Sequence, residues 1–289
     1  MFDPLIGLAK ARMRALSHLL YFRSLAHRDH VRFLGHGVVY FDPADGRATW
    51  LRQSHGVTQP SITALWRRAN RLLRPEVVLD IGANYGEISL SCDYPADTRL
   101  YLFEPNPAIV AHLRRSAGTH TAASRIAVEQ LAVSEGTSRM TLNVDPRNSG
   151  ASSVRARDDT DIAGVVVETT SIDAYLQSRG TTPRTLTFKI DVEGWECFAL
   201  RGMSATLGAA DRYIGLIEYD REFLAATPYG PEALVRTMRE LGACGYIGSD
   251  NKIRPFTSAS ELPEHTDIVL ARDSDLLADM KVSSFVRSR

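Results

Sequence analysis

The chain has 289 residues, of which 44% are hydrophobic, and it carries 34 basic and 34 acidic side chains. This length suits one large domain or a domain with an appendage, and the composition argues against disordered, fibrous and membrane-spanning classes. Three widely spaced cysteines without a C-x-x-C pair argue against a disulfide framework or a cysteine-based zinc site and favour a reducing compartment.

Residues 4–27 have the pattern of a basic amphipathic helix, in which apolar side chains alternate with Lys10, Arg12 and Arg14. Residues 1–74 hold 12 basic and 4 acidic residues, so this segment is basic and the rest of the chain is acidic. Such a helix packs on its own domain, on a second subunit in a homodimer, or on an anionic membrane surface as a peripheral contact. The basic residues also interrupt the first apolar stretch, unlike a secretory signal, so we expect a cytoplasmic protein without a transmembrane segment.

The next residues predict a β-hairpin and a helix. Residues 37–41 and 48–51 flank an Asp-Gly turn, which is typical of a hairpin. Ser61 is expected to cap a helix that ends near Leu73. We interpret residues 1–74 as an N-terminal extension that serves oligomerisation or covers the acceptor, and residues 75–289 as the main domain.

From residue 77 onward, predicted strands and helices alternate, which indicates an α/β fold with a mainly parallel, doubly wound sheet. A further hairpin, near 139–144 and 164–168, interrupts this alternation and holds a long loop. The last two strands are expected to form an antiparallel pair at one edge. The predicted strands are 77–81, 99–104, 125–131, 186–191, 213–219, 244–248 and 266–271, and the predicted helices are 86–92, 106–117, 171–178, 193–202 and 231–242.

The first of these strands ends in Asp80 and is followed by the turn Gly82-Ala83-Asn84-Tyr85-Gly86. A dinucleotide site needs G-x-G-x-x-G, but Asn84 stands in place of the middle glycine, and Asp80 would repel a pyrophosphate. S-adenosylmethionine carries a sulfonium and no phosphate, so it suits this turn. Glu104 ends the second strand, where a carboxylate accepts both hydroxyls of a ribose. The predicted cofactor contacts here are Asp80, Gly82, Asn84, Tyr85, Gly86, Glu104 and Pro105.

Three strings of this sequence resemble the FkbM family of S-adenosylmethionine-dependent O-methyltransferases. They are D-I-G-A-N-Y-G from residue 80, F-E-P-N-P from residue 103, and F-K-I-D-V-E-G-W-E over residues 188–196. The resemblance covers about residues 75–272. It implies a Rossmann-like class I methyltransferase sheet of seven strands, a contact between Ala132 and adenine, and acceptor hydroxyls on sugars, glycolipids or macrolide-type products.

Two further strands end in acids, Asp191 and Glu218, at the edge of the sheet where ligands bind in doubly wound folds. We expect Asp191 to take the acceptor's proton or to orient the acceptor, with Glu218 as its partner. Lys189 is a second candidate for the catalytic group, or it pairs with an acid. Alternatively, Asp191 and Glu218 hold Mg²⁺, which lowers the pKa of the acceptor hydroxyl. The predicted acceptor contacts are His55, Asn148, Ser152, Glu193 and Tyr219.

The sequence therefore predicts an S-adenosylmethionine-dependent O-methyltransferase that acts on a hydroxyl of a sugar, an oligosaccharide or a glycosylated metabolite. A macrolide or polyketide acceptor is one alternative, and a non-catalytic module that only binds the methyl donor is another. A nucleic-acid partner is not expected, because the main domain is acidic and no N-P-P-[YF]-type motif is present.

Overall fold

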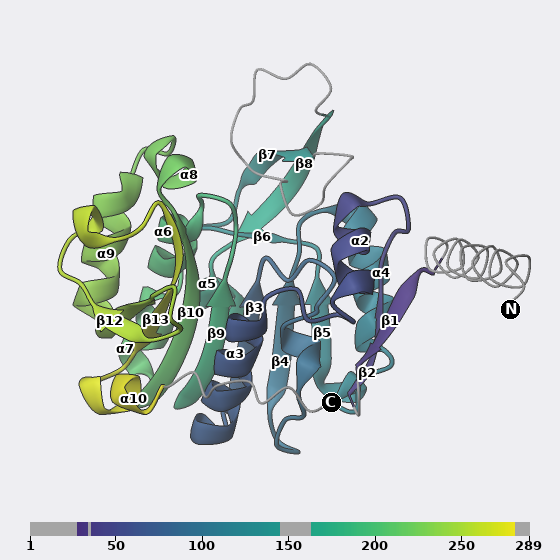
Figure 1. Ribbon diagram of the computed structural model, residues 1–289, viewed down its shortest axis with the longest axis horizontal. Helices are drawn as coiled ribbons and strands as arrows, with labels where there is room; N and C mark the ends of the chain where they lie inside the picture. The colour runs from purple at the N-terminus through teal and green to yellow at the C-terminus, as the bar shows by residue number, and fades with distance from the viewer. Residues whose placement is uncertain (1–27, 34–35, 145–162, 281–289) are drawn as a thin grey trace, which may run out of the picture.

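The computed structural model describes residues 28–33, 36–144 and 163–280. Its centre is a mixed sheet in which neighbouring strands follow the order β12-β11-β13-β10-β9-β3-β4-β5 (Figure 1). Five neighbouring strands are parallel, and the last three in the chain are antiparallel to their neighbours. The parallel strands are β3 (Val77–Ile81), β4 (Arg99–Phe103), β5 (Ile126–Glu129), β9 (Thr185–Ile190) and β10 (Arg212–Asp220), and the others are β11 (Ala243–Ile247), β12 (Ile253–Pro255) and β13 (His265–Ala271).

The topology confirms the predicted α/β class and all seven predicted strands of the sheet. The antiparallel edge is also confirmed, since β13 lies between β10 and β11 and pairs antiparallel with both. The short strand β12 adds an eighth member that the sequence analysis did not predict. Chain order reverses between β3 and β9, so the crevice where doubly wound sheets bind ligands opens above these two strands.

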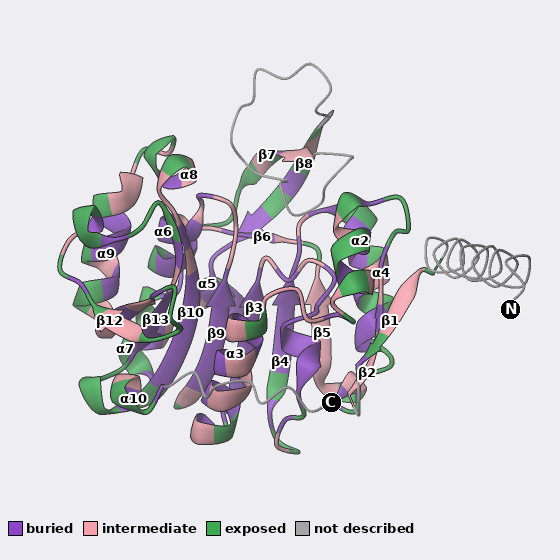
Figure 2. Ribbon diagram, in the orientation of Figure 1, coloured by how far each residue is buried: buried purple, intermediate pink, exposed green. Residues whose placement is uncertain are grey.

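Helices cover both faces of the sheet, and the residues of its central strands are mostly buried (Figure 2). Successive side chains of a strand point to opposite faces, and most of these are apolar, so both faces need a covering layer. One face packs against the helices that follow β8, β9 and β10, and the other against α3, α4 and α10. The helices are α2 (Gly46–Gln53), α3 (Pro60–Leu73), α4 (Pro107–Ala117), α5 (Ile172–Ser178), α6 (Glu196–Arg201), α7 (Ser204–Ala209), α8 (Arg221–Ala225), α9 (Gly230–Leu241) and α10 (Ser274–Asp279), with short 3-10 turns η1 (Ser89–Ser91), η2 (Ala123–Arg125) and η4 (Ala259–Glu261).

The N-terminal hairpin prediction is wrong in its second arm. Strand β2 (Gly37–Tyr40) pairs instead with the preceding strand β1 (His30–Phe33), and residues 46–53 form helix α2. The Asp45 side chain accepts a hydrogen bond from the backbone N–H of Arg47 and so caps α2, which competes with the hairpin turn that Asp-Gly favours. Ala48 and Leu51, three residues apart, then bury one face of the helix.

Helix α3 has the predicted extent, but Ser61 is not its cap. Pro60 occupies the first turn, and the Ser61 hydroxyl donates to Asn251 Oδ1 at 2.7 Å. The buried side of α3 joins one core cluster with Val78 and Ile214 of the sheet. The division at residue 74 stays a prediction, although this part of the extension packs directly on the sheet.

The predicted helix at 86–92 is also wrong, because only the 3-10 turn η1 follows the glycine turn. The inserted hairpin is confirmed as β7 (Arg139–Val144) and β8 (Ala163–Thr170), and β8 also pairs with β6 (Ala132–Val133). Figure 1 shows this hairpin standing beyond the carboxyl ends of the central strands. The predicted basic helix at 4–27 lies outside the described residues, and within the described ranges no helix is long and apolar enough to cross a bilayer.

Candidate active site

The glycine turn after β3 folds back on itself and on the end of β4. Gly82, Asn84 and Gly86 have φ angles of 77°, 50° and 86°, in the left-handed region. The backbone N–H groups of Gly82 and Ala83 both donate to the carbonyl of Phe103 at 3.0 Å. Those of the next three residues, 84–86, donate to Glu104 Oε2, Asn84 Oδ1 and the Ala83 carbonyl at 2.9, 2.9 and 2.8 Å. Every amide of residues 82–86 therefore has an acceptor inside the protein.

Glu104 is held rigidly at the end of β4. Its two carboxylate oxygens accept the backbone N–H groups of Asn84 and Asn106, each at 2.9 Å. Burial raises the pKa of Glu104 to about 7, while these two hydrogen bonds oppose the shift. Each carboxylate oxygen has a further lone pair, so the group can accept additional hydroxyls from a ligand.

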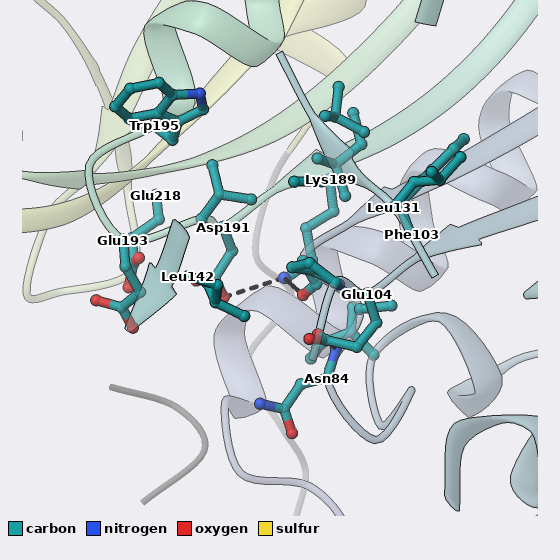
Figure 3. Close-up of a pocket in the computed structure, with 18 of the residues that line it drawn as sticks. Asn84, Phe103, Glu104, Leu131, Leu142, Lys189, Asp191, Glu193, Trp195 and Glu218 are labelled. Carbon is teal, nitrogen blue, oxygen red and sulfur yellow. Dashed lines mark hydrogen bonds and ion pairs between the residues drawn. The ribbon is translucent and has the colours of Figure 1, made fainter. Parts of the chain in front are cut away.

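A pocket of about 930 Å³ opens between this turn and the carboxyl ends of β9 and β10. In Figure 3, Glu104 and Asn84 lie on one side, Glu193 and Glu218 lie together on the other, and Asp191 and Lys189 stand between them. The predicted residues that line the pocket are Gly82, Asn84, Glu104, Pro105, Ala132, Lys189, Asp191, Glu193 and Glu218.

Lys189 is a buried cation at the centre of the site. Its ammonium lies 3.0 Å from Asp191 Oδ2 and 3.8 Å from Asp80 Oδ1, and it donates to the Gly82 carbonyl at 3.3 Å. Burial opposes its charge, but Asp191 and Asp80 outweigh this effect and raise the pKa of Lys189. A lysine that keeps its proton is a poor base, so the geometry agrees with the pairing role.

Asp80 lies behind Lys189 and is buried, and it is absent from the described lining of the pocket. Burial raises the pKa of Asp80, against the attraction of Lys189. Its influence on a ligand therefore passes through Lys189 and the glycine turn, rather than through direct contact.

Three carboxyl groups, those of Asp191, Glu193 and Glu218, each offer an oxygen atom within 4.8 Å of the others. Burial raises the pKa of Asp191, but the charge of Lys189 and a hydrogen bond from Glu218 outweigh this, so the pKa of Asp191 is lowered. Burial and the charge of Asp191 raise the pKa of Glu193 to about 8 and that of Glu218 well above its usual range. One ionised carboxylate beside two carboxyls with elevated pKa values is the arrangement that acid–base chemistry uses.

Arg47 is a pocket residue that the sequence analysis missed. It projects from the first turn of α2, and its Nε donates to Glu87 Oε1 at 3.0 Å. Thr58 Oγ1 donates to the same oxygen at 3.3 Å, and Glu87 is only 2% exposed. The sequence did contain evidence for helix α2, which carries Arg47: Asp45 can cap a helix, and the apolar residues of α2 have helical spacing. The Asp-Gly pair instead suggested a hairpin.

Most apolar side chains of the pocket lining other than Trp195 were also missed. Trp195 lines the pocket, stacks on Phe198 with a centroid separation of 3.8 Å, and donates its indole N–H to Ser134 Oγ at 3.2 Å. Leu142 reaches the pocket from β7 of the inserted hairpin. Gln59, just before α3, also lines the pocket, and the other lining residues, which were not predicted, are Ile81, Ala83, Glu87, Ile88, Phe103, Leu131, Val133 and Val192.

Several predicted contacts lie away from the described pocket lining. Tyr85 is fully buried, and its hydroxyl donates to Asp45 Oδ2 at 2.6 Å, while Gly86 packs against Leu90 and Leu113. His55 is exposed on the loop after α2. The remaining three are Tyr219, which is buried in the core, and Asn148 and Ser152, which lie outside the described residues.

Comparisons with known proteins give one family and a set of similar folds. Residues 80–247 match the family described as the methyltransferase FkbM domain. A methyltransferase FkbM structure from Methylobacillus flagellatus is 17% identical with a TM-score of 0.40, and the match covers 89% of this chain and 60% of that one. The magnesium protoporphyrin IX methyltransferase of Synechocystis is 14% identical with a TM-score of 0.39, over 78% of this chain and 83% of that one. No curated protein matches the chain.

Proposed function

Because the chain belongs to the FkbM family of methyltransferases, we propose that it transfers the methyl group of S-adenosylmethionine to a hydroxyl oxygen of a carbohydrate or a glycosylated small molecule. The observation that carries the choice of donor is the turn over residues 82–86, whose backbone amides are all engaged inside the protein. A pyrophosphate needs free amides and a helix N-terminus at this corner, but all of these amides are occupied and only a 3-10 turn follows.

The remaining features of this corner suit an adenosine without phosphate. The Glu104 carboxyl group faces the pocket, where its oxygens can accept the two hydroxyls of a ribose. Leu131, Ala132 and Leu142 line an apolar part of the pocket, which suits a purine ring. The ionised Asp191 carboxylate favours the positive sulfonium centre of the donor.

When bound, S-adenosylmethionine supplies an electrophilic methyl group. The acceptor's O–CH₃ bond forms as the S–CH₃ bond breaks, and the hydroxyl proton must leave. Asp191 is ionised and orients the acceptor hydroxyl as a hydrogen-bond acceptor, while its ion pair with Lys189 fixes the carboxylate. The proton passes to Asp191, the ionised member of the carboxyl cluster, and Glu218 supports this carboxylate as its hydrogen-bond partner.

The carboxyl cluster also supports a polyhydroxyl acceptor. A sugar presents several hydroxyls that both donate and accept, and the cluster offers one ionised acceptor beside two carboxyls that also donate when protonated, so the two are complementary. A macrolide or polyketide acceptor has fewer such donors and is the second candidate. A module that only binds the donor has no need of a carboxyl cluster whose pKa values are separated, so we favour catalysis.

The experiment that tests the donor is isothermal titration of the full chain with S-adenosylhomocysteine and, separately, with NAD. We expect binding of the thioether and no heat with NAD. Binding of NAD without S-adenosylhomocysteine would contradict the proposal. The acceptor is then sought by mass spectrometry, with radiolabel-free detection of one added methyl group on oligosaccharides and on macrolides offered separately.

Mg²⁺ remains a prediction from the sequence, supported by the spacing of the oxygens of Asp191, Glu193 and Glu218. Three carboxylates, one from β10 and two from the loop after β9, can hold such a hard cation, which would then lower the pKa of the acceptor hydroxyl. If turnover is unchanged after exhaustive EDTA treatment, the metal prediction is rejected. If turnover is lost and then restored by Mg²⁺, the prediction is supported.

A further inference from the structure

The amino-acid end of the donor carries a carboxylate, and the pocket offers it little positive charge. This inference rests on the proposed function. Two of the described residues that line the pocket are cationic, Arg47 and Lys189. The acidic side chains of the lining are Glu87, Glu104, Asp191, Glu193 and Glu218. A carboxylate that enters such a pocket needs a cation or free N–H groups to offset the repulsion.

Most of the available donors are already engaged. Lys189 is held by Asp191, Asp80 and the Gly82 carbonyl. The amides of residues 82–86 all donate within the protein, so the glycine turn forms no anion cradle. Arg47 differs from these groups, because Nε and Nη2 donate to Glu87 while Nη1 donates to no residue of the described part of the chain.

Arg47 is also fixed in place relative to the glycine turn. Asp45 caps α2 through the Arg47 backbone N–H at 2.9 Å and accepts the hydroxyl of Tyr85, from the glycine turn, at 2.6 Å. Glu87, which lies just after the same turn and is 2% exposed, anchors the guanidinium itself. The Arg47 side chain therefore loses little conformational entropy when it binds a ligand, because these contacts already fix its rotamer.

We propose that Arg47 binds the carboxylate of the donor's amino-acid moiety, with Glu87 as the positioning residue that aims the guanidinium. A planar guanidinium suits a carboxylate, because both present parallel groups for charge-assisted hydrogen bonds. The basic side chain comes from the N-terminal extension, so this proposal gives the extension a part in donor binding in addition to any role toward the acceptor.

The test combines a protein change with a ligand change. S-adenosylhomocysteine has the amino-acid moiety, and 5′-methylthioadenosine has the same nucleoside thioether without it. By isothermal titration, Arg47→Gln should weaken the binding of S-adenosylhomocysteine about 10-fold or more, as expected for the loss of one charged hydrogen-bonded pair. The affinity for 5′-methylthioadenosine should stay nearly unchanged. Arg71→Gln is the matched control, since Arg71 is exposed on α3 and the charge change is the same.

Arg47→Gln leaves Glu87 buried without its cation, so Arg47→Lys provides a second variant that keeps the charge. This variant should show a smaller loss of affinity, again only for S-adenosylhomocysteine. The proposal would be overturned if Arg47→Lys lost the same affinity for both ligands, or lost affinity for neither. Unchanged donor binding with weakened binding of an acidic acceptor would also overturn it and assign Arg47 to the acceptor. Failure of wild type to bind either ligand would instead contradict the proposed function.

Discussion

At the scale of a single residue, the proposed chemistry depends most on Asp191. It is the one member of the carboxyl cluster whose pKa is lowered, because Lys189 lies 3.0 Å away and outweighs the effect of burial. Its charge in turn helps to raise the pKa values of Glu193 and Glu218. Removing this single charge should therefore disturb the protonation of the whole cluster as well as the orientation of the acceptor.

Asp191→Asn should lower the turnover number by about 10² to 10⁴-fold, the range of general acid–base catalysis, while S-adenosylhomocysteine still binds. Lys189 keeps Asp80 as a partner at 3.8 Å, so the variant is expected to fold. Turnover and titration calorimetry measure the two effects. Asp211→Asn, at an exposed ion pair with Arg184, is the matched control. Wild-type turnover in Asp191→Asn would remove Asp191 from the mechanism.

The glycine turn is the element that holds the site together. A Cβ atom on Gly82 would lie 1.8 Å from the carbonyl oxygen of Asp191, so the turn and the end of β9 are in backbone contact. The backbone N–H of Asp191 also donates to the Ile81 carbonyl at 3.1 Å. The glycine turn and the end of β9 therefore form one unit, although 107 residues separate Gly82 from Lys189 in the chain.

Gly82→Ala should lower the free energy of unfolding by at least about 2 kcal/mol, because it adds a steric overlap to a left-handed φ of 77°. Urea denaturation measures the change. Gly208→Ala on α7 is the control, since its Cβ would meet no heavy atom within 4 Å and helix propensity favours alanine there. A Gly82→Ala protein as stable as Gly208→Ala would show that the turn and β9 are not in the contact described.

At the scale of the whole molecule, one buried carboxyl group beside the site makes stability depend on pH. Glu196 is buried, and its Oε1 accepts the N–H groups of Val192 and Gly194 at 3.0 and 3.1 Å. Burial raises the pKa of Glu196 to about 7, above the usual value of 4.5. The folded state therefore keeps a proton that the unfolded chain releases, so this contribution to stability is present at low pH and is lost as the pH rises through about 7.

Glu196→Gln should remove this dependence, since glutamine keeps an oxygen for the two N–H groups and cannot ionise. Between pH 4.5 and 8, wild type should lose about 3 kcal/mol of stability relative to Glu196→Gln, from a pKa rise of about 2.5 units. Urea melts of both proteins at the two pH values measure the difference. A constant difference across this range would mean that the pKa of Glu196 is not raised in the folded protein.

Part of the site was predictable from local pattern. Parallel strands present their carboxyl ends at the same edge of a sheet, so Glu104, Asp191 and Glu218 could be expected to converge there. Other residues were misplaced for physical reasons. Tyr85 turns into the core because Asp45, forty residues earlier, accepts its hydroxyl, and the Asp-Gly pair begins a helix because that same Asp45 caps it.

The sequence by itself determined the strand order of the chain, the glycine turn and the acids at the strand ends, because these depend on hydrophobic periodicity and on residues close together in the chain. Only the tertiary structure decided which groups are charged and which face the ligand. Lys189 forms ion pairs with Asp80 at the end of β3 and with Asp191 just after β9. Arg47 reaches the pocket from a helix that local propensity did not indicate. Burial and contacts between distant residues set those properties, and neither is encoded in local pattern.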